Sequence, residues 1–205
     1  MDNESNFWVW YLNHTEPTYI ENAGNAQELQ RRNSLNLVKR WRNAIDIGSN
    51  VGEWTRPLAK KFQQVICFEP NPNFRKCFKK NINEKNVILR PYALSTHSHT
   101  AEQGFNHTHL NFTVGDTEPR IGNINCRSLD SFELTDVDYI KIDVDGFEVP
   151  VLLGAEKTLR TNNPVINIEM KGTKRPKIVQ NAREILRNYG YRLYNKVKSD
   201  EVWFK

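Results

Sequence analysis

The sequence predicts an α/β protein with a mostly parallel seven-stranded sheet, helices on both faces of the sheet and an antiparallel hairpin at the C-terminal end. Two observations predict this fold. From residue 43 onward, short apolar segments alternate with segments of helical spacing, the pattern of βαβ units. The first apolar segment also runs through a turn with two glycines, Asp46 to Gly52, into a helix. We expect an α/β domain over residues 43–205, preceded by an aromatic and helical extension over residues 1–42.

The expected elements follow one another with short connections. Residues 26–42 show helical spacing before the first strand, and Pro57 falls in the first turn of the next helix, where its missing amide hydrogen costs little. Residues 96–125 contain scattered Thr, Gly, His and Asn and are expected to form an irregular or hairpin insertion. Strands are expected at residues 43–48, 64–69, 86–92, 138–143, 164–169, 191–194 and 201–204, and helices near residues 53–63, 72–82, 148–160 and 175–189.

The composition favours a soluble cytoplasmic protein. A length of 205 residues suits one α/β domain, and with a mean hydropathy of -0.69 no apolar run approaches the roughly 18 residues of a membrane span. The acidic N-terminus does not resemble a signal peptide, and the odd, widely spaced cysteines Cys67, Cys77 and Cys126 favour reduced thiols. The net charge of +5 is compatible with a nucleic-acid partner, but a solvated basic surface explains it better. The sequence carries no signal for a particular oligomeric state.

The turn from Asp46 to Gly52 predicts a site for a nucleotide-like ligand without phosphates. Asn50 stands where a dinucleotide site needs its second glycine, and no Gly-Lys-Ser/Thr follows to bind a triphosphate. S-adenosylmethionine (SAM) fits better, because it combines an adenosine with an amino acid, and Asp46 would favour its cationic groups. Glu69 ends the second strand twenty-one residues after Gly48, where a carboxylate can accept both ribose hydroxyls.

Six sequence blocks in a fixed order resemble the FkbM family of SAM-dependent methyltransferases over about residues 44–170. Asp145 departs from the family, which more often has Glu there. The blocks are Asp46 to Gly52, Phe68-Glu69-Pro70-Asn71-Pro72, Tyr92-Ala93-Leu94-Ser95, Ser128-Leu129-Asp130, Ile140 to Glu148, and Gly154-Ala155-Glu156 with Ile168-Glu169.

The resemblance implies a Rossmann-like class I methyltransferase with SAM as cofactor and the terminal hairpin typical of that class. By the rule that ligands bind at the carboxyl ends of parallel strands, the blocks should share one rim of the sheet. The expected cofactor-binding residues are Asp46, Gly48, Ser49, Asn50, Gly52, Glu69, Pro70, Asn71, Ala93, Leu94 and Asp143.

Methyl transfer to a hydroxyl requires alignment and removal of the hydroxyl proton, either by a base or with the help of a divalent metal. Asp143 and Glu169, at the ends of the fourth and fifth strands, are the best pair for the base or for Mg²⁺. Asp145 is expected either to act in catalysis or to cap the following helix. His107 and His109, like His97 and His99, could assist as a base or bind a metal, although a polar surface loop is the simpler interpretation.

The resemblance favours an O-methyltransferase that modifies a hydroxyl of a sugar, glycan or other small polar metabolite, because members of the family that resemble this chain often modify glycans or natural products. The alternatives are an RNA ribose 2′-O-methyltransferase and a SAM-binding module without catalysis. Amino-directed base methylation is disfavoured, because residues 143–147 read Asp-Val-Asp-Gly-Phe in place of an Asn/Asp-Pro-Pro-aromatic turn.

Overall fold

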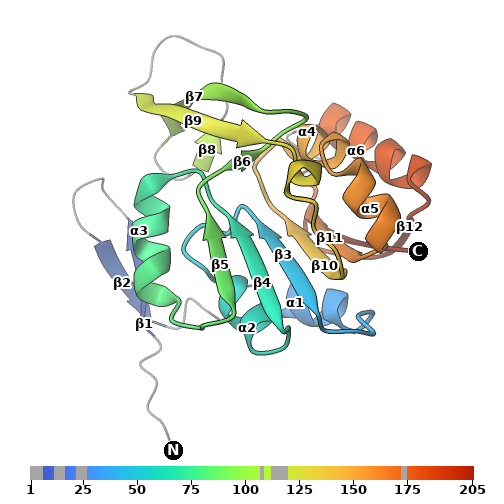
Figure 1. Ribbon diagram of the computed structural model, residues 1–205, viewed down its shortest axis with the longest axis horizontal. Helices are drawn as coiled ribbons and strands as arrows, with labels where there is room; N and C mark the ends of the chain where they lie inside the picture. Colours follow the sequence, from blue (N-terminus) through green and yellow to red (C-terminus); the bar gives the residue numbers. More distant parts are fainter. Residues whose placement is uncertain (1–6, 12–16, 22–26, 107–108, 112–119, 172–174) are drawn as a thin grey trace, which may run out of the picture.

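The main sheet has the predicted architecture. In a computed structural model, residues 7–11, 17–21, 27–106, 109–111, 120–171 and 175–205 are described. Seven strands form one sheet in the order β12-β13-β11-β10-β3-β4-β5, in which β11, β10, β3, β4 and β5 are parallel (Figure 1). Their bounds are β3 (Asn43–Ile47), β4 (Gln64–Phe68), β5 (Val87–Arg90), β10 (Val137–Ile142), β11 (Val165–Glu169), β12 (Arg192–Val197) and β13 (Asp200–Phe204). The antiparallel hairpin β12–β13 joins the sheet through β13, as the sequence predicts.

Helices cover both faces of this sheet. One apolar cluster joins sheet residues such as Ala44 and Val65 to α1, α2 and α3, and a second joins Ile45 and Ile166 to α4, α5 and α6. Alternate residues of each buried strand thus face opposite helical layers. The bounds are α1 (Glu28–Leu35), α2 (Thr55–Ala59), α3 (Pro72–Asn81), α4 (Glu148–Leu153), α5 (Glu156–Asn162) and α6 (Pro176–Asn188). None of the described helices is long and apolar enough to cross a membrane.

The strand order reverses between β3 and β10. The chain runs outward from β3 to β4 and β5 and then returns to place β10 on the other side of β3. At such a point the loops after two neighbouring strands diverge and leave a crevice at the carboxyl edge. Here the backbone amide of Asp143 donates a hydrogen bond of 3.1 Å to the carbonyl oxygen of Ile47, which fixes the two loops against each other.

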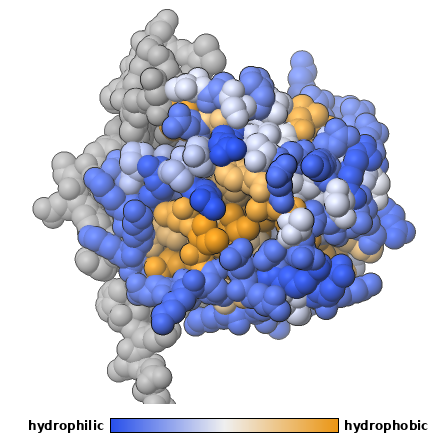
Figure 2. Space-filling view, in the orientation of Figure 1, coloured by the Kyte–Doolittle hydropathy of each residue, from blue (hydrophilic) through white to orange (hydrophobic). Residues whose placement is uncertain are grey.

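The insertion between β5 and β10 forms a second sheet. Its strands β6 (Ala93–Leu94), β7 (His99–Asn106), β8 (His109–Asn111) and β9 (Arg120–Arg127) have the order β6-β9-β7-β8, and β7 pairs antiparallel with β9 as in a hairpin. This sheet lies beyond the carboxyl ends of β3, β4 and β5 (Figure 1). Between β5 and β10, the described residues contain no α-helix, only the 3-10 helix η2 (Leu129–Phe132). On the face of the molecule seen in Figure 2, an apolar area lies over β4 and β5.

Three of the predicted helices differ from the helices in the structure. Helical spacing extends to residue 42, but α1 ends at Leu35, and residues 38–42 form no helix. The helix expected at residues 53–63 is regular only over α2.

The helix expected at residues 148–160 is two helices, α4 and α5. The break lies at Gly154, where a Cβ atom would lie 2.0 Å from the carbonyl oxygen of Ser95. The carboxylate of Asp130 then accepts hydrogen bonds from the amides of Lys157 and Thr158, so α5 has an N-terminal cap from outside its own sequence. Local spacing could not indicate a break that depends on contacts with residues 95 and 130.

The N-terminal segment contains a hairpin of β1 (Phe7–Tyr11) and β2 (Pro17–Glu21), and β1 lies beside α3. In contrast, α1 belongs to the core of the domain. Leu35, its last residue, joins the apolar cluster of the sheet, and the hydroxyls of Ser34 and Tyr139 lie 2.8 Å apart in the interior.

Candidate active site

A cavity of about 250 Å³ is bordered by the segments that follow β3, β4, β5, β10 and β11. It therefore lies at the carboxyl edge of the sheet, on the rim that the sequence predicts. The predicted cofactor residues that line it are Gly48, Asn50, Glu69, Pro70, Ala93, Leu94 and Asp143, and Asp145 and Glu169 of the predicted catalytic set line it as well.

Glu69 presents a fixed carboxyl group to this cavity. The side chain is almost fully buried, and its two oxygens accept hydrogen bonds from the amides of Asn50, at 2.9 Å, and Asn71, at 2.8 Å. Burial raises the pKa of Glu69 to about 7, although the two amide hydrogen bonds lower it. The carboxyl group is thus held at the tip of β4 by backbone donors from two loops.

The glycines of the first turn make room for the protein's own backbone. Gly48 has a φ angle of 74°, and a Cβ atom there would lie 2.0 Å from the carbonyl oxygen of Asp143. Gly52 has a φ angle of 101°, and its Cβ would lie 2.7 Å from the side chain of Ile82. Both positions therefore require glycine for backbone conformation and for close packing, before any ligand is considered.

Asp46 supports the turn from behind and does not line the cavity. Its carboxylate is fully buried, accepts a 2.7 Å hydrogen bond from the hydroxyl of Thr55 and lies 3.4 Å from the ammonium nitrogen of Lys141. Lys141 also donates to the carbonyl oxygen of Gly48 at 2.8 Å. Burial lowers the pKa of Lys141, but the carboxylates of Asp46 and Asp143 outweigh it, so the net pKa is raised. Three other predicted cofactor residues, Ser49, Gly52 and Asn71, likewise do not line the cavity.

Three carboxylates converge at one end of the cavity. Asp143, Asp145 and Glu169 each offer an oxygen, and these oxygens lie within 4.8 Å of one another. The ammonium nitrogen of Lys171 lies 2.5 Å from an oxygen of Asp145 and 2.8 Å from one of Glu169, while Lys141 lies 4.0 Å from Asp143. Burial, together with the nearby Asp143 carboxylate, raises the pKa of Glu169 to about 7, although Lys171 lowers it. A carboxyl group with such a pKa can exchange a proton near neutral pH.

Asp145 does not occupy the N-cap position of the following helix. The N-cap residue of α4 is Phe147, and no side-chain cap hydrogen bond is formed there. Instead, Glu148 accepts a hydrogen bond of 2.9 Å from the amide of Gly146, which closes the turn. The side chain of Asp145 is left to pair with Lys171 in the cavity.

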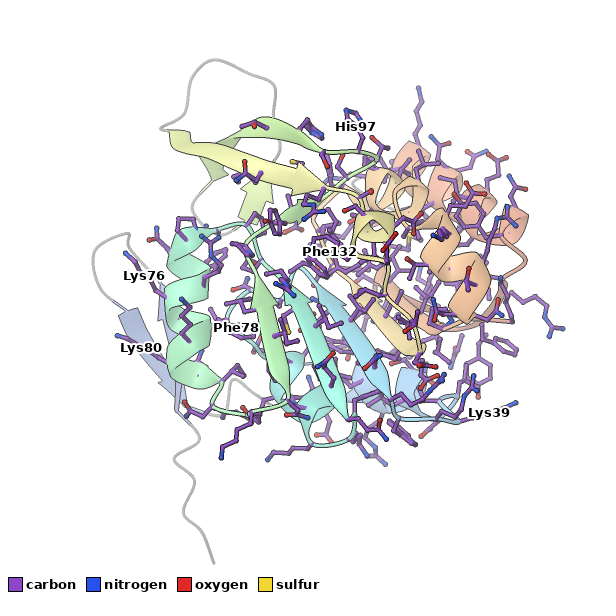
Figure 3. All side chains as sticks on the ribbon, in the orientation of Figure 1. Lys39, Lys76, Phe78, Lys80, His97 and Phe132 are labelled. Atoms are coloured by element: carbon purple, nitrogen blue, oxygen red, sulfur yellow. The ribbon has the colours of Figure 1, made fainter. Side chains whose placement is uncertain are left out.

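The predicted histidines are not part of the described cavity lining. His107 lies outside the described residues, and His109 is described only as a backbone position on β8. His97 and His99 are exposed, and the Nδ1 atom of His97 lies 2.8 Å from the hydroxyl of Thr96. Figure 3 shows His97 at the outer edge of the molecule, beyond the main sheet.

Several lining residues were not expected from the sequence. Glu53 and Trp54 directly follow the glycine turn, and burial raises the pKa of Glu53 to about 7. Gln27 comes from the start of α1 and accepts a hydrogen bond from the indole of Trp54. The position of Glu53 and Trp54 after Gly52 was a usable signal, whereas no sequence pattern connects Gln27 to the site.

Comparison with solved structures shows the same fold in methyltransferases. An FkbM methyltransferase from Methylobacillus flagellatus KT aligns with a TM-score of 0.60 and 16% identity over 83% of this chain and 45% of that one. The precorrin-6y C5,15-methyltransferase of Geobacter metallireducens GS-15 aligns with a TM-score of 0.54 and 14% identity, over 99% of this chain and 92% of that one. The Streptococcus mutans protein SMU.1697c, a putative methyltransferase solved in complex with SAH (S-adenosylhomocysteine), aligns with a TM-score of 0.50 and 13% identity, over 86% of this chain and 94% of that one. The chain thus spans less than half the length of the Methylobacillus protein.

The doubly wound sheet with its reversed hairpin is the Rossmann-like fold of these methyltransferases, and the cavity lies at its carboxyl edge, where that fold binds ligands. Residues 46–193 match the model of the methyltransferase FkbM domain. The chain therefore belongs to the FkbM methyltransferase family, as the sequence blocks predict. Compared with the curated proteins, it has no significant match in sequence.

Proposed function

We propose that the protein transfers the methyl group of SAM to a hydroxyl group of a sugar, a glycan or another small polar metabolite. The observation that supports this proposal is one cavity with two differently placed carboxyl groups. Glu69 lies among backbone donors at the tip of β4, and Glu169 lies in the carboxylate cluster at the tip of β11. The first suits binding of a ribose and the second suits removal of a proton.

The residues at the β3 and β4 tips fit SAM. Glu69 can accept hydrogen bonds from ribose hydroxyls, and Phe68, Phe74 and Tyr92 give the cavity an aromatic wall next to Leu94 for an adenine ring. The acidic groups Glu53 and Asp143 favour the positive charge of an ammonium and a sulfonium. When bound, SAM supplies an electrophilic methyl group with a good leaving group.

Glu169 is the proposed general base. As the acceptor oxygen forms its bond to the methyl carbon, the carbon–sulfur bond breaks and the hydroxyl proton passes to the carboxylate of Glu169. A pKa of about 7 allows Glu169 to be ionised before the transfer and to hold the proton after it. The Asp143 carboxylate lies next to the base, and its negative charge opposes the buildup of a free alkoxide and favours transfer of the proton to Glu169.

The acidic cluster argues against an RNA acceptor. A ribose 2′-hydroxyl is adjacent to a phosphodiester, which would bring a negative charge close to Asp143, Asp145 and Glu169. Like charges at such a contact cost binding energy and select against the ligand. A neutral polyhydroxyl acceptor avoids this cost. Ribose 2′-O methylation is kept as the second candidate for one reason, the net charge of +5, which favours an anionic partner. A SAM-binding module without catalysis is disfavoured by the three carboxylates that converge at one end of the cavity.

A magnesium ion is not part of this proposal. Asp143, Asp145 and Glu169 offer the hard oxygen ligands that Mg²⁺ prefers, but the ammonium of Lys171 already pairs with two of them. These residues therefore do not fit a divalent ion. We expect the reaction to occur in a reducing compartment such as the cytoplasm, because the described cysteines Cys67, Cys77 and Cys126 are free and buried.

The test combines binding and turnover. Calorimetry with S-adenosylhomocysteine and with NAD measures which cofactor binds, and release of S-adenosylhomocysteine from SAM is then followed with sugars, amino sugars, polyols, phenols and a short RNA. The proposal predicts S-adenosylhomocysteine binding and turnover with a neutral polyhydroxyl compound. Binding of NAD alone would refute the cofactor, and turnover with RNA alone would establish the second candidate.

A further inference from the structure

We propose that the ammonium group of Lys171 takes the place of a divalent cation among Asp143, Asp145 and Glu169, so that methyl transfer needs no metal ion. Lys171 is then a positioning residue that holds the proposed base. The role of Lys171 in methyl transfer rests on the proposed function. Its role as the cation among the three carboxylates does not depend on that function.

The contacts of Lys171 are those of a cation among carboxylates. Its nitrogen lies 2.5 Å from Asp145 and 2.8 Å from Glu169, on two oxygens of a set whose members lie within 4.8 Å of one another. A divalent ion bound to the same oxygens would stand within a few ångströms of this ammonium and be repelled by it. Ammonium and metal ion are therefore alternatives for this cluster.

The charge of Lys171 is stable in this position. Burial lowers its pKa, but hydrogen bonds to Asp145 and Glu169 outweigh this effect and raise the pKa above the ordinary lysine value. The remaining carboxylate, Asp143, lies 4.0 Å from the second ammonium, that of Lys141. Lys141 lies nearer to Asp46, at 3.4 Å, so Lys171 is the ammonium that pairs with the carboxylates of the cluster itself.

The backbone at the end of β11 directs Lys171 to the cluster. In an extended segment, residues two positions apart point to the same side, so Lys171 follows Glu169 toward the cavity. Met170, between them, is buried in the apolar cluster on the other face, and its amide donates a 2.7 Å hydrogen bond to the carbonyl of Ser199. This anchoring fixes the backbone next to Lys171 at the end of β11.

The experiment measures Mn²⁺ binding to the full chain, by calorimetry and by the electron paramagnetic resonance signal of free Mn²⁺, up to about 1 mM, where weak carboxylate sites bind divalent ions. The proteins are wild type, Lys171→Met, Lys171→Arg and Lys157→Met. Lys157 is an exposed lysine of α5 that does not line the cavity, so Lys157→Met is the matched control for loss of one positive charge.

We expect Lys171→Met to bind Mn²⁺ at least about tenfold more tightly than wild type, because the substitution leaves Asp145 and Glu169 without the ammonium group that pairs with them. Lys171→Arg and Lys157→Met should resemble wild type. Equal Mn²⁺ affinity in wild type and Lys171→Met would overturn the proposal. Tight Mn²⁺ binding by the wild-type protein would overturn it as well, and this outcome can be seen without any variant. Should Lys171→Met not fold, Lys171→Gln replaces it in the same comparison.

The same samples separate this inference from the proposed function. Titration with S-adenosylhomocysteine tests the cofactor site without any metal ion, and its failure would count against the proposed function but leave the Mn²⁺ result unchanged. Once an acceptor is found, turnover by wild type should be unaffected by EDTA. A rate that collapses in EDTA and returns with Mg²⁺ would overturn the inference while leaving methyl transfer intact.

Discussion

Gly48→Ala should weaken both the fold and the cofactor site. The new Cβ atom would lie 2.0 Å from the carbonyl oxygen of Asp143, and the φ angle of 74° is unfavourable for any residue with a side chain. The left-handed conformation costs about 1–2 kcal/mol. Overpacking adds about 1–3 kcal/mol. The free energy of unfolding should therefore fall by about 2–5 kcal/mol in total.

Gly190→Ala provides the matched control. Gly190 also has a positive φ angle, 86°, but its Cβ would meet only the side chain of Lys205 at 3.7 Å, an ordinary contact. Its cost should be the conformational part alone, about 1–2 kcal/mol. Both changes restrict the unfolded chain equally, so the difference between them measures the contact between Gly48 and Asp143.

Denaturant unfolding followed by tryptophan fluorescence, with S-adenosylhomocysteine titration of each variant, measures both effects. For a chain of this size, 1 kcal/mol corresponds to about 2–4 °C in Tm, so the two variants should be separable by thermal unfolding as well. Cofactor affinity should fall in Gly48→Ala and stay unchanged in Gly190→Ala. If the two variants had equal stability and equal affinity for S-adenosylhomocysteine, the contact between Gly48 and the carbonyl oxygen of Asp143 would contribute to neither.

Three further predictions concern the carboxyl groups of the cavity. Asp143→Asn should abolish turnover but keep the affinity for S-adenosylhomocysteine within about tenfold, as expected of a group that acts in the transition state; unchanged turnover would remove Asp143 from the catalytic residues. Because a base acts only when ionised, kcat should rise with pH through the Glu169 pKa of about 7 and level off above it. If a Glu169→Gln variant kept this rise of kcat with pH, Glu169 would be excluded as the base. Glu69→Gln should reduce affinity for S-adenosylhomocysteine by about 10–100-fold through loss of charged hydrogen bonds to the ribose. Glu156→Gln, on the exposed part of α5, is the control, and equal affinities in the two variants would contradict the assignment of Glu69.

The strands of the main sheet were predictable because each is marked by its own residues. Apolar runs such as residues 64–68 and 165–169 are buried along their whole length or nearly so, and such runs are visible without knowledge of their neighbours. Helix ends were less predictable. The break at Gly154 depends on Ser95 and Asp130, and nothing in the spacing of residues 148–160 reports those contacts.

The same distinction applies to the candidate site. The sequence pointed to Gly48, Asn50 and Glu69, since a strand, a turn and an acid at the next strand end form a pattern within about twenty residues. It also assigned Asp46 to the ligand, whereas this carboxylate lies behind the turn with Thr55 and Lys141. A motif indicates which residues are near a site but not which side of the backbone they occupy.

By itself, the sequence determined the strands of the main sheet, the family and the strand ends that border the cavity, because these depend on short-range patterns of apolar and glycine residues. Only the tertiary structure decided that Lys171 lies on Asp145, twenty-six residues away, and that Glu169 has a pKa of about 7. The physical reason is that burial and Coulomb interactions depend on distances in space, which folding sets between residues far apart in the chain.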